Sequence, residues 1–217
     1  MSWSSGLTAA IPGSDFRYSA ADLAMGLKAK LAAHNNLSLD LFGGFAEGEV
    51  PAQDRFYLAE VQPAAQYDNK WFASRGTLPG KIRGRGHLFL TDAVSMPGYL
   101  YAYPTGLKKL AGRFAFQIPN PALVFELRDD AVTRNLRKID YEVYIAHGAV
   151  WDDPGLARSG DFLTEAGLQI SYEVPYWERF FGKEKLYLFL PLYLSDPRAG
   201  DDSWHFRWAV SISGLLD

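Results

Sequence analysis

The C-terminal part of the chain alternates between apolar and polar residues, and this pattern sets the predicted architecture. In 204–214, written WHFRWAVSISG, the apolar side chains from Trp204 to Ile212 occupy the even positions. Successive side chains of a strand point to opposite faces, so the stretch predicts a strand with one apolar and one polar face. Two tryptophans and a phenylalanine begin the apolar face, and such rings concentrate where a barrel wall crosses the membrane–water boundary. A tilted strand of about ten residues spans a hydrocarbon layer. The stretch therefore predicts the closing strand of a transmembrane β-barrel.

Seven earlier segments show the same period of two, which makes eight predicted strands. An even count lets the first and last strands pair antiparallel, and this removes open edges that lipid would not tolerate. The predicted fold class is all-β: an eight-stranded antiparallel transmembrane β-barrel that forms a single domain over 1–217. Eight strands leave an interior that side chains largely fill, so we expect no open pore. The earlier segments are 3–11, 16–31, 37–44, 112–127, 139–151, 164–174 and 186–194.

Segment 16–31 also permits a helical interpretation. Its sequence AADLAMGLKAKLAAH is rich in good helix formers. We favour a strand because the apolar residues from Leu23 to Leu31 recur at intervals of two, not of three and four.

A long loop, 47–110, separates the third and fourth predicted strands. At its centre lies GKIRGRGH, residues 80–87. Connections of this length are uncommon in compact domains and are usually functional. Arginine side chains inside a small barrel must be paired, because burying a lone charge is costly. We therefore predict a lumen lock, in which the loop motif pairs with inward-facing acids; an exposed basic loop is the alternative. The predicted lock comprises Arg83, Gly84, Arg85, Asp140, Glu142, Glu165 and Glu173.

Large aromatic residues near the predicted strand ends are candidates for a membrane girdle. Tryptophan and tyrosine are enriched at both membrane interfaces. Ordinary core aromatics are the alternative for each of them. The girdle candidates are Trp151, Trp177, Trp204, Trp208 and Tyr172.

The composition of the chain limits its membrane topology and the classes of partner it can bind. Charged residues make up 22% of the chain and aromatic residues 15%, which suits a barrel whose two faces average out. The longest apolar run, 186–194, is too short for a spanning helix and contains Pro191. A net charge of -3 and the lack of a long basic cluster argue against nucleic acid. No signal peptide is visible at the N-terminus, so we expect either that a leader has been removed or that the chain is a piece of a longer protein.

Catalytic and metal-binding patterns are missing from the sequence. There are no cysteines, which fits export through an oxidising periplasm, and the four histidines lack ligand spacing. No G-x-S-x-G motif occurs, and the paired aspartates lie beside turn-forming residues, as solvated loop charge does. We predict no enzyme activity, no cofactor and no metal.

Several short motifs in the second half resemble a known family. After the Arg-Gly motif come G-A-V-W at 148–151, G-L at 167–168, P-L-Y-L-S-D-P at 191–197 and an aromatic closing strand. This order, over about residues 37–214, resembles the C-terminal half of the bacterial surface-antigen superfamily. That superfamily contains BamA/TamA-type and two-partner-secretion outer-membrane barrels.

The resemblance implies a location in the bacterial outer membrane and sixteen-stranded relatives that insert or translocate other proteins. Arg83-Gly84 would match the Arg-Gly motif of the loop inserted into the lumen of those barrels. Ala146 stands where they usually carry an aspartate, and Gln169 stands where they commonly carry an arginine. In one variant of the family, an eight-stranded barrel is attached to a periplasmic or surface enzyme such as a peptidase.

Three functions remain open at this point. The first is an outer-membrane barrel that serves as the membrane anchor or dimerisation module of a larger exported protein. Its expected partners are the lipid bilayer, a second copy through the barrel seam and a covalently linked periplasmic or surface domain. The second is a protein insertion or translocation barrel. The third is a soluble barrel that binds an apolar ligand, which would require an apolar interior and a polar exterior.

Overall fold

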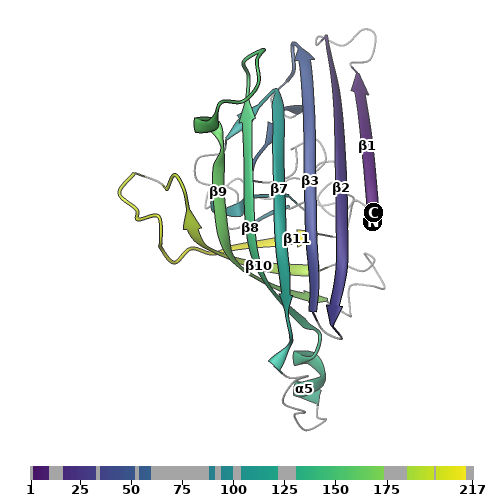
Figure 1. Ribbon diagram of the computed structural model, residues 1–217, viewed down its shortest axis with the longest axis vertical. Coiled ribbons are helices and arrows are strands. Elements are labelled where there is room, and N and C mark those ends of the chain that lie inside the picture. Colours follow the sequence, from purple (N-terminus) through teal and green to yellow (C-terminus); the bar gives the residue numbers. More distant parts are fainter. Residues whose placement is uncertain are drawn as a thin grey trace.

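Eight strands follow one another in chain order, each antiparallel to the next, in a sheet of nine strands (Figure 1). The computed structural model describes residues 2–9, 17–32, 35–51, 54–59, 88–90, 94–99, 104–121, 131–173, 185–197 and 199–213. The strands are β1 (Ser2–Ala9), β2 (Tyr18–Ala32), β3 (Asn35–Gly48), β7 (Lys108–Ile118), β8 (Ile139–Trp151), β9 (Leu163–Glu173), β10 (Lys185–Leu194) and β11 (Ala209–Ser213).

These strands match the eight segments with a period of two, so the predicted all-β antiparallel class is confirmed. The helical alternative for 16–31 is wrong, because β2 pairs along its length with β1 on one edge and β3 on the other. Hydrogen bonding to two neighbours outweighs the helix propensity of its alanines and lysines.

Some predicted boundaries were wrong. Strand β7 begins at Lys108 and ends at Ile118, directly before Pro119, which has no N–H group to donate to a ladder. Strand β11 begins only at Ala209, and Trp204 forms an isolated antiparallel bridge with Tyr193. Alternation in sequence thus extends further than ladder pairing at this end of the sheet.

The sheet remains open in the part of the chain that the structure describes. The predicted pairing of the first and last strands is not observed. The free edge of β11 pairs instead with β5 (Leu88–Leu90), in parallel, and β5 comes from the long loop. Strand β1 ends the sheet on the other side. Figure 1 shows the sheet curling, with β10 and β11 crossing behind the other strands.

Parts of the long loop pack on the inward face of this curl. Short strands β4 (Phe56–Tyr57) and β6 (Thr105–Gly106) pair with each other, and a 3-10 turn, η2 (Pro97–Tyr99), lies between them in sequence. Leu58, Met96 and Tyr99 are buried in one cluster with side chains from four strands. The strand residues of that cluster are Ala115, Tyr144, Ala146, Phe189, Leu194 and Ala209.

The faces of the sheet are inverted relative to a soluble protein. On β7, Lys109 and Arg113 are buried on the inward face, while Leu110 and Phe114 are 51% and 43% exposed. The same alternation continues on β8, where Tyr144 is buried and the residues on either side of it are exposed. The exposed large apolar residues of the strands are Leu23, Leu27, Leu31, Leu41, Phe45, Leu110, Phe114, Val143, Ile145 and Leu186.

Gly167 of β9 lies against the main chain of β10. A Cβ atom on this residue would lie 2.9 Å from Pro191 Cα and closer still to the Leu190 carbonyl oxygen. Because these are backbone atoms, the ladder between β9 and β10 would have to open. We predict that Gly167→Ala lowers the free energy of unfolding in detergent by about 3 kcal/mol.

Gly160 provides the matched control for this prediction. A Cβ atom on it meets nothing within 4 Å, so Gly160→Ala should change the free energy of unfolding by no more than about 0.5 kcal/mol. Denaturant titration followed by far-UV circular dichroism measures both variants. Equal stabilities for the two would contradict the close approach at Gly167.

Candidate functional site

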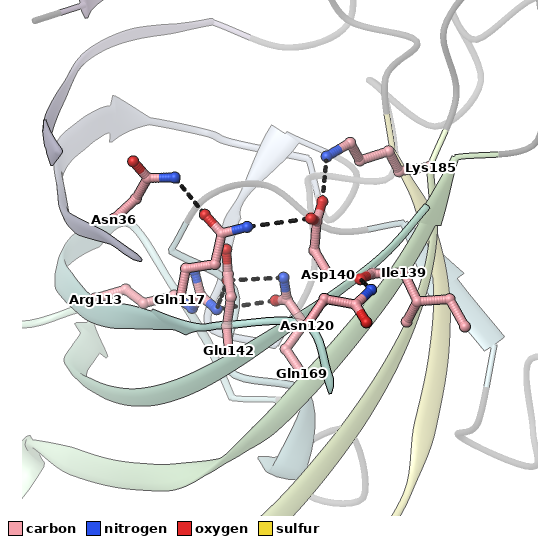
Figure 2. A network of polar contacts seen from close by, with 9 residues as sticks. All are labelled: Asn36, Arg113, Gln117, Asn120, Ile139, Asp140, Glu142, Gln169 and Lys185. Carbon is pink, nitrogen blue, oxygen red and sulfur yellow. Dashed lines mark hydrogen bonds and ion pairs between the residues drawn. The ribbon is translucent and has the colours of Figure 1, made fainter. Parts of the chain in front are cut away.

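A buried polar triangle lies on the inward face, on three adjacent strands (Figure 2). Arg113 of β7 donates to Gln169 of β9 at 2.9 Å and to Glu142 of β8 at 3.3 Å. Gln169 in turn donates to the same Glu142 oxygen at 3.0 Å. The Arg113 guanidinium also lies 4.9 Å from the centre of the Tyr144 ring. The triangle gives Nη2 of the buried guanidinium one charged and one neutral acceptor, while its buried Nε–H has no hydrogen-bond partner among the described residues.

A second polar chain runs across the sheet near the end of β7, as Figure 2 also shows. Asn36 of β3 donates to Gln117 of β7, and Gln117 donates to Asp140 of β8 at 3.1 Å. Lys185 of β10 reaches over β9 and forms an ion pair with Asp140 at 3.2 Å. The chain therefore links four strands on the same face as the triangle.

A third contact fixes the long loop to the sheet. Glu165 of β9 is fully buried and receives two hydrogen bonds. The Tyr144 hydroxyl donates to one carboxyl oxygen at 2.5 Å, and the Gly98 backbone N–H donates to the other at 2.6 Å. A side chain at position 98 does not fit, because a Cβ atom there would lie 2.5 Å from Leu194 Cδ2 and 2.7 Å from Glu165 Oε2. Glu165 is therefore the point at which the turn η2 is held against the wall.

Tyr99 extends this contact to the end of the sheet. Its hydroxyl donates to the Thr164 carbonyl oxygen at 2.9 Å and accepts from the Ser195 backbone N–H at 3.1 Å. Burial raises the pKa of the Tyr99 hydroxyl, so the group remains a donor. The Tyr99 side chain therefore joins the long loop to β9 and to the residue that follows β10.

An exposed ionic contact fixes the loop to the residue that follows β8, at the same end of the sheet as Thr164 and Ser195. Arg55 donates to the Asp152 carboxylate, and the Leu107 backbone N–H donates to the same carboxylate at 2.9 Å. The Arg55 hydrogen bond is the main cause that holds the pKa of Asp152 below its ordinary value of 3.8, and the Leu107 N–H adds to it.

This contact predicts a pH dependence. A carboxyl group whose pKa is lower in the folded state contributes stability above its unfolded pKa and loses it as pH falls through the folded value. The Tm of the parent protein in detergent should therefore exceed that of Asp152→Asn at about pH 5, and the difference should shrink towards about pH 3. We expect the ion pair to contribute less than about 1 kcal/mol to the free energy of unfolding. The Asp152 side chain is 58% exposed, so solvent screens the pair. A difference in Tm that grows on acidification would contradict the assignment.

The predicted lumen lock is placed only in part. Asp140 and Glu142 lie on the inward face (Figure 2), and Glu165 is fully buried there. Their observed partners are Gln117, Lys185, Arg113, Gln169, Tyr144 and Gly98, which come from other strands and from η2. Arg83, Gly84 and Arg85 lie outside the described residues, as does the side chain of Glu173. The pairing of the loop arginines therefore stays a prediction.

The girdle candidates occupy different environments. Trp204 and Trp208 are 71% and 44% exposed, and Trp204 packs on Tyr193 at a ring distance of 5.0 Å. Trp151 is half-buried and donates from its indole nitrogen to the Gly155 carbonyl oxygen at 3.0 Å. Tyr172 is half-buried at the end of β9, and Trp177 lies outside the described residues.

Sequence reasoning missed the main cation of the inward face. On β7, Phe114 faces outward together with Gly112 and Phe116, which lie two positions before and after it. The residues between them alternate to the other face, so Arg113 and Gln117 face inward. The alternation alone is therefore enough to predict that both side chains face inward. Gly98 and Tyr99 lie in a loop without periodicity, so no sequence pattern pointed to their contacts with Glu165 and Ser195.

The inward face contains hydrogen-bonded networks and a docked loop. In the part of the chain that the structure describes, no group of three or more His, Cys, Asp or Glu side chains is placed to hold a metal ion. No helix among the same residues is long and apolar enough to cross a membrane.

No model of a known protein family matches the chain, and a search of curated protein sequences found no match. The surface-antigen resemblance therefore rests on the motifs alone.

Proposed function

We propose that this chain forms the wall of a bacterial outer-membrane β-barrel and serves as the membrane anchor or dimerisation module of a larger exported protein. The observation that carries the proposal is the inverted facing of the sheet. Large apolar side chains such as Phe114 and Ile145 are exposed on the outward face, while Arg113 and Glu165 are buried on the inward face.

A lipid-facing wall explains both halves of this arrangement. In a bilayer the backbone polar groups of a strand must be satisfied by neighbouring strands, and the ladders from β1 to β11 do so. Outward side chains are then apolar, and inward side chains are polar. In water, exposing this many large apolar side chains on one continuous face would favour aggregation.

A soluble barrel for apolar ligands fits the facing poorly. Such a barrel needs an apolar interior, whereas the inward face here carries Arg113, Glu142, Glu165 and Gln169. Its outer surface would need polar residues at positions that hold Leu110, Phe114 and other apolar side chains.

An anchor fits the inward face better than a conducting or inserting barrel. Leu58, Met96 and Tyr99 of the long loop occupy the space against β8 and β10. The inward polar groups Arg113, Glu142 and Gln169 are hydrogen-bonded to one another, and Glu165 is bonded to the loop. We therefore propose a non-catalytic anchor, with protein insertion or translocation as the second candidate that the motif resemblance supports.

Refolding with and without a membrane mimetic tests the proposal. The denatured chain is diluted into plain buffer, into detergent micelles and into phosphatidylcholine vesicles, and sheet content is followed by far-UV circular dichroism. We expect sheet structure and protease resistance only with micelles or vesicles. A stable, monodisperse sheet protein in plain buffer would contradict a lipid-facing wall.

A further inference from the structure

The hairpin between β10 and β11 exposes three large aromatic side chains on the segment that leads back into β11. Trp204, Phe206 and Trp208 are 71%, 67% and 44% exposed. Figure 1 shows this hairpin, in yellow, projecting sideways from the sheet past β9. Single exposed apolar residues are ordinary, but several together on a projecting segment mark an interaction surface. These three residues and Tyr193 are called the aromatic patch below.

The aromatic patch continues the outward face of the sheet. Leu194 and Ala209 are both buried in the core cluster of the inward face, so their neighbours Tyr193 and Trp208 point outward. Trp204 forms an antiparallel bridge with Tyr193 and therefore lies on the same face. The rings of these two residues pack with their centres 5.0 Å apart. The patch thus adjoins the apolar face that the proposed function places in lipid.

The charged residue within this segment is turned away from solvent and bonded to the hairpin itself. Arg207 donates to the carbonyl oxygens of Asp202, at 2.7 Å, and of His205, at 3.3 Å. Its guanidinium also lies 3.8 Å from the Asp201 carboxylate, and its side chain is only 13% exposed. The aromatic residues on either side of it are the exposed ones. This arrangement is the reverse of a hairpin that faces water, where charged side chains are exposed and aromatic ones buried.

The main chain of the same segment leaves the ladder. Antiparallel pairs between β10 and β11 end at Phe189↔Ala209, and beyond them the described residues form the single bridge Tyr193↔Trp204. Main chain outside a ladder is costly in hydrocarbon, because lipid tails offer no hydrogen-bonding groups. Exposed aromatic rings are unfavourable in water. The boundary between headgroups and acyl chains meets both requirements, since it offers water to the main chain and apolar contact to the rings.

We infer that the aromatic patch inserts into the headgroup–acyl boundary of the bilayer and forms a local lipid-binding site that holds one end of the wall at a fixed depth. The inference rests on the proposed membrane function and adds this site to it. Other girdle candidates are less available to lipid. Trp151 is half-buried and its indole N–H donates to the Gly155 carbonyl oxygen, and Tyr172 is half-buried as well. Among the described candidates, the contact with the boundary is therefore concentrated on this hairpin.

Depth-dependent fluorescence quenching tests the site, because the chain contains no cysteine and accepts a single label. Phe206→Cys carries the fluorophore in the patch. Leu156→Cys is the matched control, since Leu156 is an apolar residue that is 91% exposed in the hairpin between β8 and β9, at the same end of the sheet. Both full chains are refolded into phosphatidylcholine vesicles that contain lipids brominated at defined acyl positions, and aqueous iodide is added separately.

We expect the probe at 206 to lie about 5–10 Å below the headgroup level, as the apolar face of an interfacial segment does. Brominated lipid then quenches this probe several-fold more strongly than the probe at 156, and iodide shows the opposite order. Trp204→Cys, at the most exposed position of the patch, gives the same measurement if Phe206→Cys fails to refold.

Two other outcomes overturn the inference in distinguishable ways. Iodide quenching at 206 that equals the quenching at 156 shows that the patch meets water. Protection of the probe at 206 from both quenchers shows that protein covers the patch, whether a second copy or another segment of the chain. Either result leaves the proposed membrane wall standing as long as sheet structure forms only with vesicles or micelles. Folding in plain buffer contradicts that wall itself.

Discussion

Replacing Glu165 with alanine is expected to release the long loop from the wall and to lower the free energy of unfolding by about 3–5 kcal/mol. The carboxyl group accepts from the Tyr144 hydroxyl and the Gly98 N–H, and it is fully buried. Its removal leaves two buried donors without an acceptor, and each costs about 1–3 kcal/mol. Denaturant unfolding in detergent measures the loss, and limited proteolysis detects cleavage of the loop near η2.

Glu165→Gln is the matched control for this prediction. Glutamine keeps the size of the side chain and one acceptor oxygen, but its amide group cannot accept from the second donor. Its stability should lie between those of the parent and of Glu165→Ala. If the alanine variant matches the parent in stability and protease resistance, Glu165 does not hold the loop.

The second large effect concerns the outward face of β3. Leu41 lies in the middle of this strand and Phe45 lies four residues further on, on the same face, and both are exposed. An arginine at the bilayer midplane costs about 2–4 kcal/mol, and one near the interface costs about 0–1 kcal/mol. We therefore expect Leu41→Arg to destabilise the protein in vesicles by the larger amount and Phe45→Arg by the smaller.

Alanine variants at the same two positions separate the effect of charge from that of lost side-chain contacts. Stability is read from urea-dependent folding into phosphatidylcholine vesicles, as the difference between arginine and alanine at each position. An exposed position on a water-facing surface tolerates either residue. Equal and small differences at Leu41 and Phe45 would therefore count against a lipid-facing strand.

The strands were predictable because the pattern that identifies them, alternation of apolar and polar residues, is local in the sequence. Alternation with period two reflects a sheet with two different faces, and β8 was found with the predicted bounds 139–151. The same alternation predicted that Asp140, Glu142 and Tyr144 lie inward. The alternation also predicted correctly that 16–31 is a strand despite its helix propensity, because pairing with neighbouring strands outweighs that propensity.

The pairing of the β11 edge and the docking of the loop were not predictable in this way. Pairing of β11 with β5 joins residues more than a hundred positions apart, and three residues carry no readable period. The contact between Gly98 and Glu165 depends on close approach of a backbone N–H, which any residue type carries. Which strands lie at the edges of the sheet depends on pairings between distant segments, for which the sequence has no local signal.

The facing of the sheet in a membrane is the central claim, and spin-label accessibility measures it most directly. Single cysteines replace Leu110, Ala111, Phe114 and Ala115 on β7, and each is labelled with a nitroxide after refolding into vesicles. We predict high accessibility to oxygen and low accessibility to a water-soluble nickel chelate at 110 and 114, and low accessibility to both reagents at 111 and 115. Preferential access of the nickel chelate at 110 and 114 would show that the apolar face meets water, and it would contradict the account.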